Sequence, residues 1–131
     1  MKFAVQINGS PYAGPAGEMA YQFVVAALSA GHTVLQIFFY FDGIYHGLAA
    51  QMPPGDERQF THRWRQLALQ NNIDLVICIS AAQRRGLLSL EESKRQNRAN
   101  QDLAPGFRIS GLGQLVEATI NADRFIVFPG S

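Results

Sequence analysis

The chain has 131 residues, of which 47% are apolar and 16% charged, a balance typical of a folded globular protein rather than a disordered one. Its length predicts one domain spanning residues 1–131. The formal net charge is +1, with cationic and anionic residues interspersed, so no basic surface for direct nucleic-acid binding is expected. The single cysteine excludes an internal disulfide and favours a reducing compartment.

No segment has the length and composition of a membrane anchor. The N-terminus lacks the apolar region and cleavage site of a signal peptide, and the apolar run 34–41 is too short to cross a bilayer. We therefore expect a cytoplasmic protein that does not contact membranes.

The first half of the chain alternates predicted strands and helices. Residues 2–7 form a short apolar run that ends at a turn cluster, and we interpret them as a buried strand. Helical spacing from 17 to 30 predicts the first helix, and the β-branched and aromatic residues 33–40 predict a second strand. A long loop follows Asp42-Gly43, and helical spacing resumes near Asp56 and ends at Asn71-Asn72.

The next strand carries the only cysteine. Residues 74–79 are apolar in succession, which predicts a strand covered on both faces, with Cys78 at its carboxyl end. A short helix is expected from Ser80 to Arg85, because Gly86 then provides a stop signal.

The C-terminal third repeats the alternation. Ser89, with Glu92 three residues later, resembles a capping box for another short helix, and residues 107–109 predict a fourth strand. Ser110 is a candidate N-cap for a further helix, and residues 124–128 predict the last strand. The expected inner face of that helix consists of Leu112, Leu115, Val116, Thr119 and Ile120.

Alternating strands and helices with short turns predict an α/β fold. We expect a three-layer α/β/α sandwich around a mostly parallel sheet of about five strands, with right-handed crossovers and flavodoxin-like topology. In such sheets the sites gather at the carboxyl ends of the strands, which is where Cys78 is predicted.

Cys78 has two interpretations. A helix N-terminus after the strand would favour a thiolate, and Arg84 and Arg85 would add positive potential, which together describe a nucleophile. The alternative is an inert core thiol, because free cysteine is among the most buried residue types. With one cysteine, any sulfur exchange needs a thiol on another molecule.

Other candidate sites are weaker. The turn from Gly9 to Gly14 lacks the Lys-Ser/Thr ending of a phosphate-binding P-loop, so we interpret it as a flexible turn that shapes a pocket beside the Cys78 loop. The chain has three histidines, His32, His46 and His62, and their spacing is not that of metal ligands. We therefore expect no metal site and no cofactor, and we interpret the histidines as surface or loop residues. His46 follows the second strand and could face the thiol, although we do not assign it a catalytic role.

Three segments resemble one known family over nearly the whole chain. They are Phe38-Phe39-Tyr40 with Asp42-Gly43, Cys78-Ile79-Ser80-Ala81-Ala82-Gln83-Arg84-Arg85-Gly86, and Ser110 to Ala118 followed by Ala122-Asp123-Arg124. They are similar to the DsrE/TusD family of sulfur-relay sulfurtransferases, which have the DsrE-like fold, and look closer to the DsrE type. A departure from the family pattern is His46-Gly47, where a smaller polar residue such as Asn is expected.

The resemblance implies a sulfurtransferase in which Cys78 is the catalytic residue and carries a persulfide. It also implies partners: two smaller paralogous subunits in a heterohexamer, an upstream persulfide donor, and a small acceptor protein of the DsrC or TusE type with a reactive cysteine. The DsrE type implies cytoplasmic oxidation of stored sulfur, and the TusD type implies tRNA 2-thiouridine synthesis. Two alternatives of another class stay open: a non-catalytic scaffold subunit, and small-ligand binding at the Gly9 to Gly14 loop.

Overall fold

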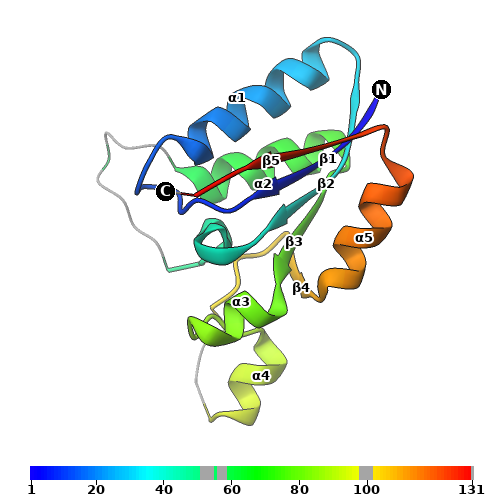
Figure 1. Cartoon of the computed structure of the whole chain (residues 1–131). Helices are drawn as coiled ribbons and strands as arrows, with labels where there is room; N and C mark the ends of the chain where they lie inside the picture. The colour runs from blue at the N-terminus through cyan, green and yellow to red at the C-terminus, as the bar shows by residue number, and fades with distance from the viewer. Residues whose placement is uncertain (51–54, 56–58, 98–101, 131) are drawn as a thin grey trace.

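The computed structural model describes residues 1–50, 55, 59–97 and 102–130, which form a five-stranded parallel sheet flanked by helices (Figure 1). The strands are β1 (Lys2–Ile7), β2 (Thr33–Phe39), β3 (Asp74–Cys78), β4 (Phe107–Ser110) and β5 (Arg124–Phe128). The helices are α1 (Ala16–Ser29), the 3₁₀ helix η1 (Phe41–Gly47), α2 (Phe60–Asn71), α3 (Ile79–Arg84), α4 (Leu90–Arg95) and α5 (Leu112–Asn121). The predicted α/β architecture with a parallel sheet is therefore confirmed.

The strand order across the sheet is β4-β3-β2-β1-β5. The chain moves outward from β1 in one direction as far as β4, and then returns to the other side of β1 to add β5. This order differs from the 2-1-3-4-5 order of flavodoxin, although both are open parallel sheets. Hydrophobic periodicity identifies strands but does not order them, so the order had to come from the structure.

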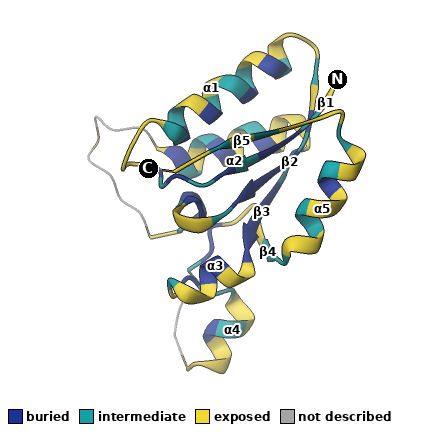
Figure 2. Ribbon diagram, viewed as in Figure 1, coloured by how far each residue is buried: buried dark blue, intermediate teal, exposed yellow. Residues whose placement is uncertain are grey.

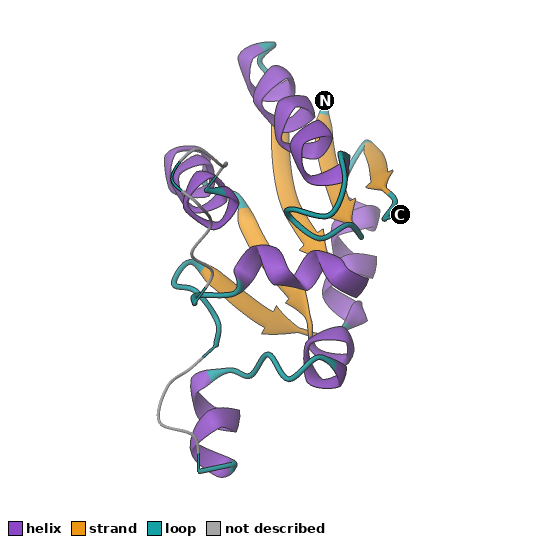
Figure 3. Cartoon of the chain, turned by 90° about the vertical axis from the view of Figure 1, so that its left-hand side faces the viewer, coloured by secondary structure: helices purple, strands orange, loops and turns teal. Residues whose placement is uncertain are grey.

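The helices α1 and α2 cover one face of the sheet and α5 covers the other, while α4 projects away from the sheet beyond α3 (Figures 1 and 3). On one face, Phe39 packs against Trp64 of α2 with ring centroids 5.9 Å apart, and Phe128 packs against Phe23 of α1 at 5.7 Å. On the other face, Arg108 of β4 donates a hydrogen bond to Gln114 of α5 at 2.7 Å. This arrangement follows from right-handed crossovers, because the return from β4 to β5 runs in the opposite direction to the earlier connections.

The central strands form the core (Figure 2). Residues 75–78 of β3 are at most 2% exposed, and residues 37–39 of β2 are 0% exposed. The prediction that the third strand is covered on both faces is confirmed. Burial on this scale makes β3 a rigid support for whatever follows its carboxyl end.

Several local signals were correct. The Ser89 hydroxyl accepts a hydrogen bond from the Glu92 backbone N–H at 3.2 Å and thereby caps α4, as the capping-box pattern predicted. Gly31 and Gly86 follow α1 and α3 with φ of +88° and +76°, the left-handed conformation that ends helices. The loop expected after Asp42 is wrong in part, because residues 41–47 form η1. The helix start predicted near Asp56 lies outside the described residues.

The helix α5 departs from its prediction in two ways. Its N-cap is Gly111, and Ser110 is the last residue of β4, so the predicted serine cap is wrong. The predicted inner face is also wrong in part, because three of its members are 46%, 55% and 75% exposed; these are Leu112, Val116 and Ile120. Ala118 is the buried residue of this helix. Apolar residues occur around much of α5, so spacing alone could not decide which side faces the sheet.

Among the described residues, no helix combines the length and apolar character needed to span a bilayer.

Candidate active site at Cys78

Cys78 is the last residue of β3 and the N-cap of α3. It pairs in register with Ser110 at the end of β4, while the preceding Ile77 pairs with Phe39 at the end of β2. The cysteine therefore lies at the carboxyl edge of the sheet, as predicted. This is the edge at which open parallel sheets place their ligand and catalytic sites.

The Cys78 side chain is fully buried, at 0% exposure. The next residue, Ile79, is 40% exposed, so the thiol lies one residue below the surface of the carboxyl edge. An external thiol can reach this sulfur only if the edge opens locally. Burial of this kind is also found for inert core cysteines, so the position of Cys78 does not by itself assign a reaction.

Exposed apolar residues follow the ends of the strand that carries Cys78 and of its two neighbours in the sheet. Phe41, Ile79 and Leu112 are 49%, 40% and 46% exposed, and they follow the ends of β2, β3 and β4 by one or two residues. We call these three residues the apolar rim. Because these strands are neighbours in the sheet, the rim lies across the end of β3, above Cys78.

Phe41 has an unusual backbone conformation. Its φ is +49°, in the left-handed region that non-glycine residues rarely adopt, and its ring stacks on Tyr40 with centroids 4.3 Å apart. Strained, exposed aromatic residues of this kind tend to occur at functional sites, because selection for function offsets the conformational cost.

The two arginines of α3 and its C-cap differ in their surroundings. Arg85 donates a hydrogen bond from Nε to Asp42 Oδ1 at 2.9 Å and another from a terminal nitrogen to the Ala81 carbonyl at 3.2 Å. The charge of Arg85 is thus balanced by Asp42, and this ion pair links α3 to η1. Arg84 is exposed and has no partner in the described part of the chain. Of the two predicted cations, Arg84 is the one whose charge is available to another molecule.

His46 is buried, which corrects the prediction of a surface or loop histidine. Its Nδ1 accepts a hydrogen bond from the Trp64 indole N–H at 3.0 Å, and its Nε2 lies 3.1 Å from the Gly9 carbonyl. This pattern requires the neutral tautomer with the proton on Nε2, donated to Gly9. Burial lowers the pKa of His46 to about 3, against a smaller opposing effect of the Gly9 hydrogen bond.

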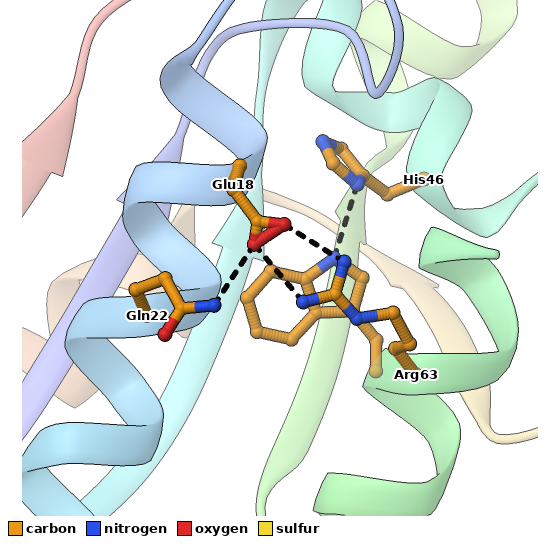
Figure 4. Close-up of polar contacts among 5 residues, drawn as sticks. Glu18, Gln22, His46 and Arg63 are labelled. Atoms are coloured by element: carbon orange, nitrogen blue, oxygen red, sulfur yellow. Dashed lines mark hydrogen bonds and ion pairs between the residues drawn. The ribbon is translucent and has the colours of Figure 1, made fainter. Parts of the chain in front are cut away.

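The contacts of His46 join η1, α2 and the β1–α1 turn on the face opposite α5 (Figure 4). None of its hydrogen bonds or ring contacts involves Cys78, so the structure does not bring this histidine to the thiol. His46 and Trp64 are separated by 18 residues and belong to different elements. No spacing rule in the sequence points to this pair.

A second polar contact joins α1 and α2. The Arg63 guanidinium donates two hydrogen bonds to Glu18, both at 3.0 Å (Figure 4). It also lies 3.7 Å from the centre of the Tyr21 ring. The hydrogen bonds to Glu18 are the main cause of a raised pKa for Arg63. This pair holds the two helices of one layer together and lies on the face opposite α5.

The turn from Gly9 to Gly14 borders a cavity of about 270 Å³. Its lining is mostly small and apolar, and its anionic member is Asp42. The cavity lies between the β1–α1 turn and the segment 128–130. The prediction that this turn shapes a pocket is confirmed, but the lining contains no residue from Cys78 to Gly86, so its expected place beside the Cys78 loop is wrong. Among the described residues, no three His, Cys, Asp or Glu side chains converge to hold a metal.

The chain belongs to the DsrE/DsrF-like family, whose model matches residues 1–128. It is 49% identical over 128 residues to the Allochromatium vinosum protein named "Putative sulfurtransferase DsrE", with 98% of each chain covered. It is 42% identical to the "Sulfurtransferase TusD homolog" of Pseudomonas aeruginosa, covering 99% of this chain and 98% of the other. The YchN protein of E. coli has the same fold, with a TM-score of 0.78, 21% identity and 98% of this chain covered.

The A. vinosum and P. aeruginosa relatives are both named sulfurtransferases, and each aligns over 98% or more of this chain. The predicted family and the predicted enzyme class, a sulfurtransferase, are therefore confirmed.

Proposed function

We propose that this chain carries sulfane sulfur as a persulfide on Cys78 and passes it to a cysteine of a partner protein. The observation that carries the proposal is the position of Cys78: the sole cysteine of a chain with sulfurtransferase relatives ends the most buried strand at the carboxyl edge of the sheet. Any reaction of this chain that requires a protein thiol must use Cys78, because the sequence contains no other cysteine.

The chemistry is two exchanges of an S–S bond. The Cys78 thiolate attacks the outer sulfur of a donor persulfide, R–S–SH, so that the bond Cys78–S–SH forms and the donor leaves as R–S⁻. An acceptor thiolate then attacks that outer sulfur, takes it as an acceptor persulfide and restores the Cys78 thiolate. Each step moves one sulfur atom and one proton together, and no oxidant or reductant is consumed.

The apolar rim is the proposed docking surface of the acceptor. The acceptor is a small protein of the DsrC or TusE type, and the donor is an upstream persulfide protein. Three exposed apolar side chains around a buried thiol suit a protein segment better than a small hydrophilic molecule. The available charge of Arg84, on the helix that begins at Ile79, suits an acidic residue beside the acceptor cysteine.

We also propose that the chain assembles with two smaller paralogous subunits into a heterohexamer. Support comes from a second exposed apolar surface, the α5–β5 face, made of Val116, Ile120, Phe125 and Val127. These side chains are 55%, 75%, 38% and 42% exposed. Several large exposed apolar side chains on a small domain are typical of subunit interfaces.

The pathway we favour is cytoplasmic oxidation of stored sulfur, as for the DsrE type. The identity of 49% to the DsrE relative, against 42% to a TusD homologue, supports this preference. Transfer of sulfur for tRNA 2-thiouridine synthesis is the alternative. Genes for a dissimilatory sulfite reductase beside this one would support sulfur oxidation, and their absence would favour tRNA thiolation.

The test of the central proposal is intact-protein mass spectrometry after incubation with a low-molecular-weight persulfide. The native chain should gain one sulfur atom, which a thiol reductant should remove, and Cys78→Ser should gain none. A native chain that gains no sulfur, or an equal gain in Cys78→Ser, would leave the scaffold role as the better account. In that role, native-state alkylation of Cys78 would be slow and would follow the pH dependence of ordinary thiols, whereas fast alkylation well below about pH 8.5 would favour the nucleophile.

A further inference from the structure

The register of β3 and β4 places a hydroxyl beside the thiol. Cys78 and Ser110 are direct partners at the ends of these two parallel strands. Partners on neighbouring strands lie about 4.8 Å apart and project their side chains to the same face of the sheet. The serine oxygen and the cysteine sulfur are each one bond beyond Cβ, so both groups stay close to the sheet on that face.

The polar contacts of these strands identify the face. Two residues before the pair, Val76 is the partner of Arg108, and side chains two apart in a strand share a face. The Arg108 guanidinium donates hydrogen bonds to Asp74 and to Gln114 of α5. Cys78 and Ser110 therefore face the α5 layer, away from His46 and Trp64.

Among the described residues, the Ser110 hydroxyl caps no helix and forms no hydrogen bond. Its position before a helix would suit an N-cap, yet the N-cap of α5 is Gly111 and no side chain caps that helix. In the described ranges the hydroxyl makes no hydrogen bond, and the residue is half-buried. A half-buried hydroxyl without a partner, beside a buried thiol, is available to donate to sulfur.

We propose that Ser110 is a positioning residue for the sulfur chemistry of Cys78: its hydroxyl donates a hydrogen bond to the thiolate and, after loading, to the persulfide. This inference rests on the proposed function of Cys78. A hydrogen bond to an anionic sulfur stabilises the attacking species and holds its direction at the sheet edge. Ser110 takes no part in the bonds that form and break.

The test compares native protein with Ser110→Ala, Ser110→Thr and the control Ser80→Ala. Ser80 is exposed on α3, two residues after Cys78. The Ser80→Ala variant therefore removes a serine hydroxyl from a position close to Cys78 in the chain. Alkylation by iodoacetamide is followed over the pH range in which thiols ionise, alongside the rate of sulfur loading from a low-molecular-weight persulfide. Circular dichroism checks that each variant is folded.

We expect Ser110→Ala to lower both rates about tenfold at neutral pH, the effect of losing one charge-assisted hydrogen bond. Its alkylation profile should move to higher pH with the same plateau, and Ser110→Thr should restore the native profile. If Ser110 had a purely structural role, Ser110→Ala would instead change the maximal alkylation rate at high pH and would leave the pH midpoint of the profile unchanged. That result, or an equal shift in Ser80→Ala, overturns the inference.

The two proposals fail separately. If the native chain gains no sulfur, the proposed function fails, whatever the alkylation profiles show. If the native chain loads normally and Ser110→Ala matches it in both measurements, the proposed function stands and the role of Ser110 is refuted.

Discussion

The indole N–H of Trp64 donates a hydrogen bond to Nδ1 of His46 at 3.0 Å, inside the layer formed by α1 and α2. Both side chains are 0% exposed. The bond fixes the tautomer of the histidine, so that Nε2 donates to Gly9 and holds the turn after β1. One buried pair thus links η1, α2 and the turn that borders the cavity.

Trp64→Phe should destabilise the protein. The variant removes the donor to His46, leaves a buried acceptor unsatisfied and creates a small void, so the free energy of unfolding should fall by about 2–3 kcal/mol. Urea denaturation followed by circular dichroism measures the change. Leu69→Ala on the same helix, where the side chain is 84% exposed, is the control and should cost less than about 0.5 kcal/mol. Equal effects of the two variants would contradict the importance of the buried bond.

Stability should depend on pH through His46. Its pKa is about 3 in the folded chain and near 6.5 when unfolded, so below pH 6.5 the unfolded chain binds the extra proton. The free energy of unfolding should therefore fall as the pH drops from 6.5 toward 3, with a slope that approaches about 1.4 kcal/mol per pH unit between these two values. Urea titrations at a series of pH values measure this slope.

His46→Asn is the matched control for that slope, because Asn retains a hydrogen-bonding side chain but does not titrate in this range. Its stability should be nearly constant over the first two pH units below 6.5. Hydrogen bonds, chiefly from Arg108, lower the pKa of Asp74 below its ordinary 3.8, so the contribution of Asp74 is lost only at more acidic pH. A native slope equal to that of the variant would show that His46 is not held neutral.

Substitution in the apolar rim should separate loading from transfer. Phe41→Ser is expected to leave sulfur loading from a low-molecular-weight persulfide within twofold of native, because the side chain is half-exposed and takes no part in the S–S bonds that form and break. Transfer to the acceptor protein should slow about tenfold, the usual cost of losing one well-packed interface aromatic. Single-turnover transfer followed by mass spectrometry measures both steps. Equal transfer rates for native chain and variant would exclude the rim as the docking surface.

The α5–β5 face should control assembly. Val116→Asp places a charge on a side chain that is 55% exposed, so the isolated chain should fold with little change in stability. Coexpressed with its two paralogues, the variant should fail to enter the hexamer, as measured by analytical ultracentrifugation. Leu69→Asp adds the same charge to an exposed apolar site on α2 and should assemble normally. Normal assembly of Val116→Asp would redirect the search for the interface to another surface.

Much of the fold could be predicted from local sequence. The strands β1 and β5 were predicted with their observed bounds, because short apolar runs end at clear turn or helix signals. The cap of α4 was predicted from Ser89 and Glu92, since the capping box is a purely local interaction. The place of Cys78 at the carboxyl end of a buried strand followed from the uninterrupted apolar run before it.

The tertiary structure decided the rest. The exposed side of α5 could not be predicted, because a helix with apolar residues on several sides has no unique inner face until it meets a sheet. The burial of His46 depends on Trp64 and Gly9, which lie 18 and 37 residues away in the chain. The pairing of Cys78 with Ser110 depends on strand order and register, which long-range packing sets. The sequence therefore determined which residue is the sulfur site candidate, and only the assembled sheet decided which hydroxyl lies beside it.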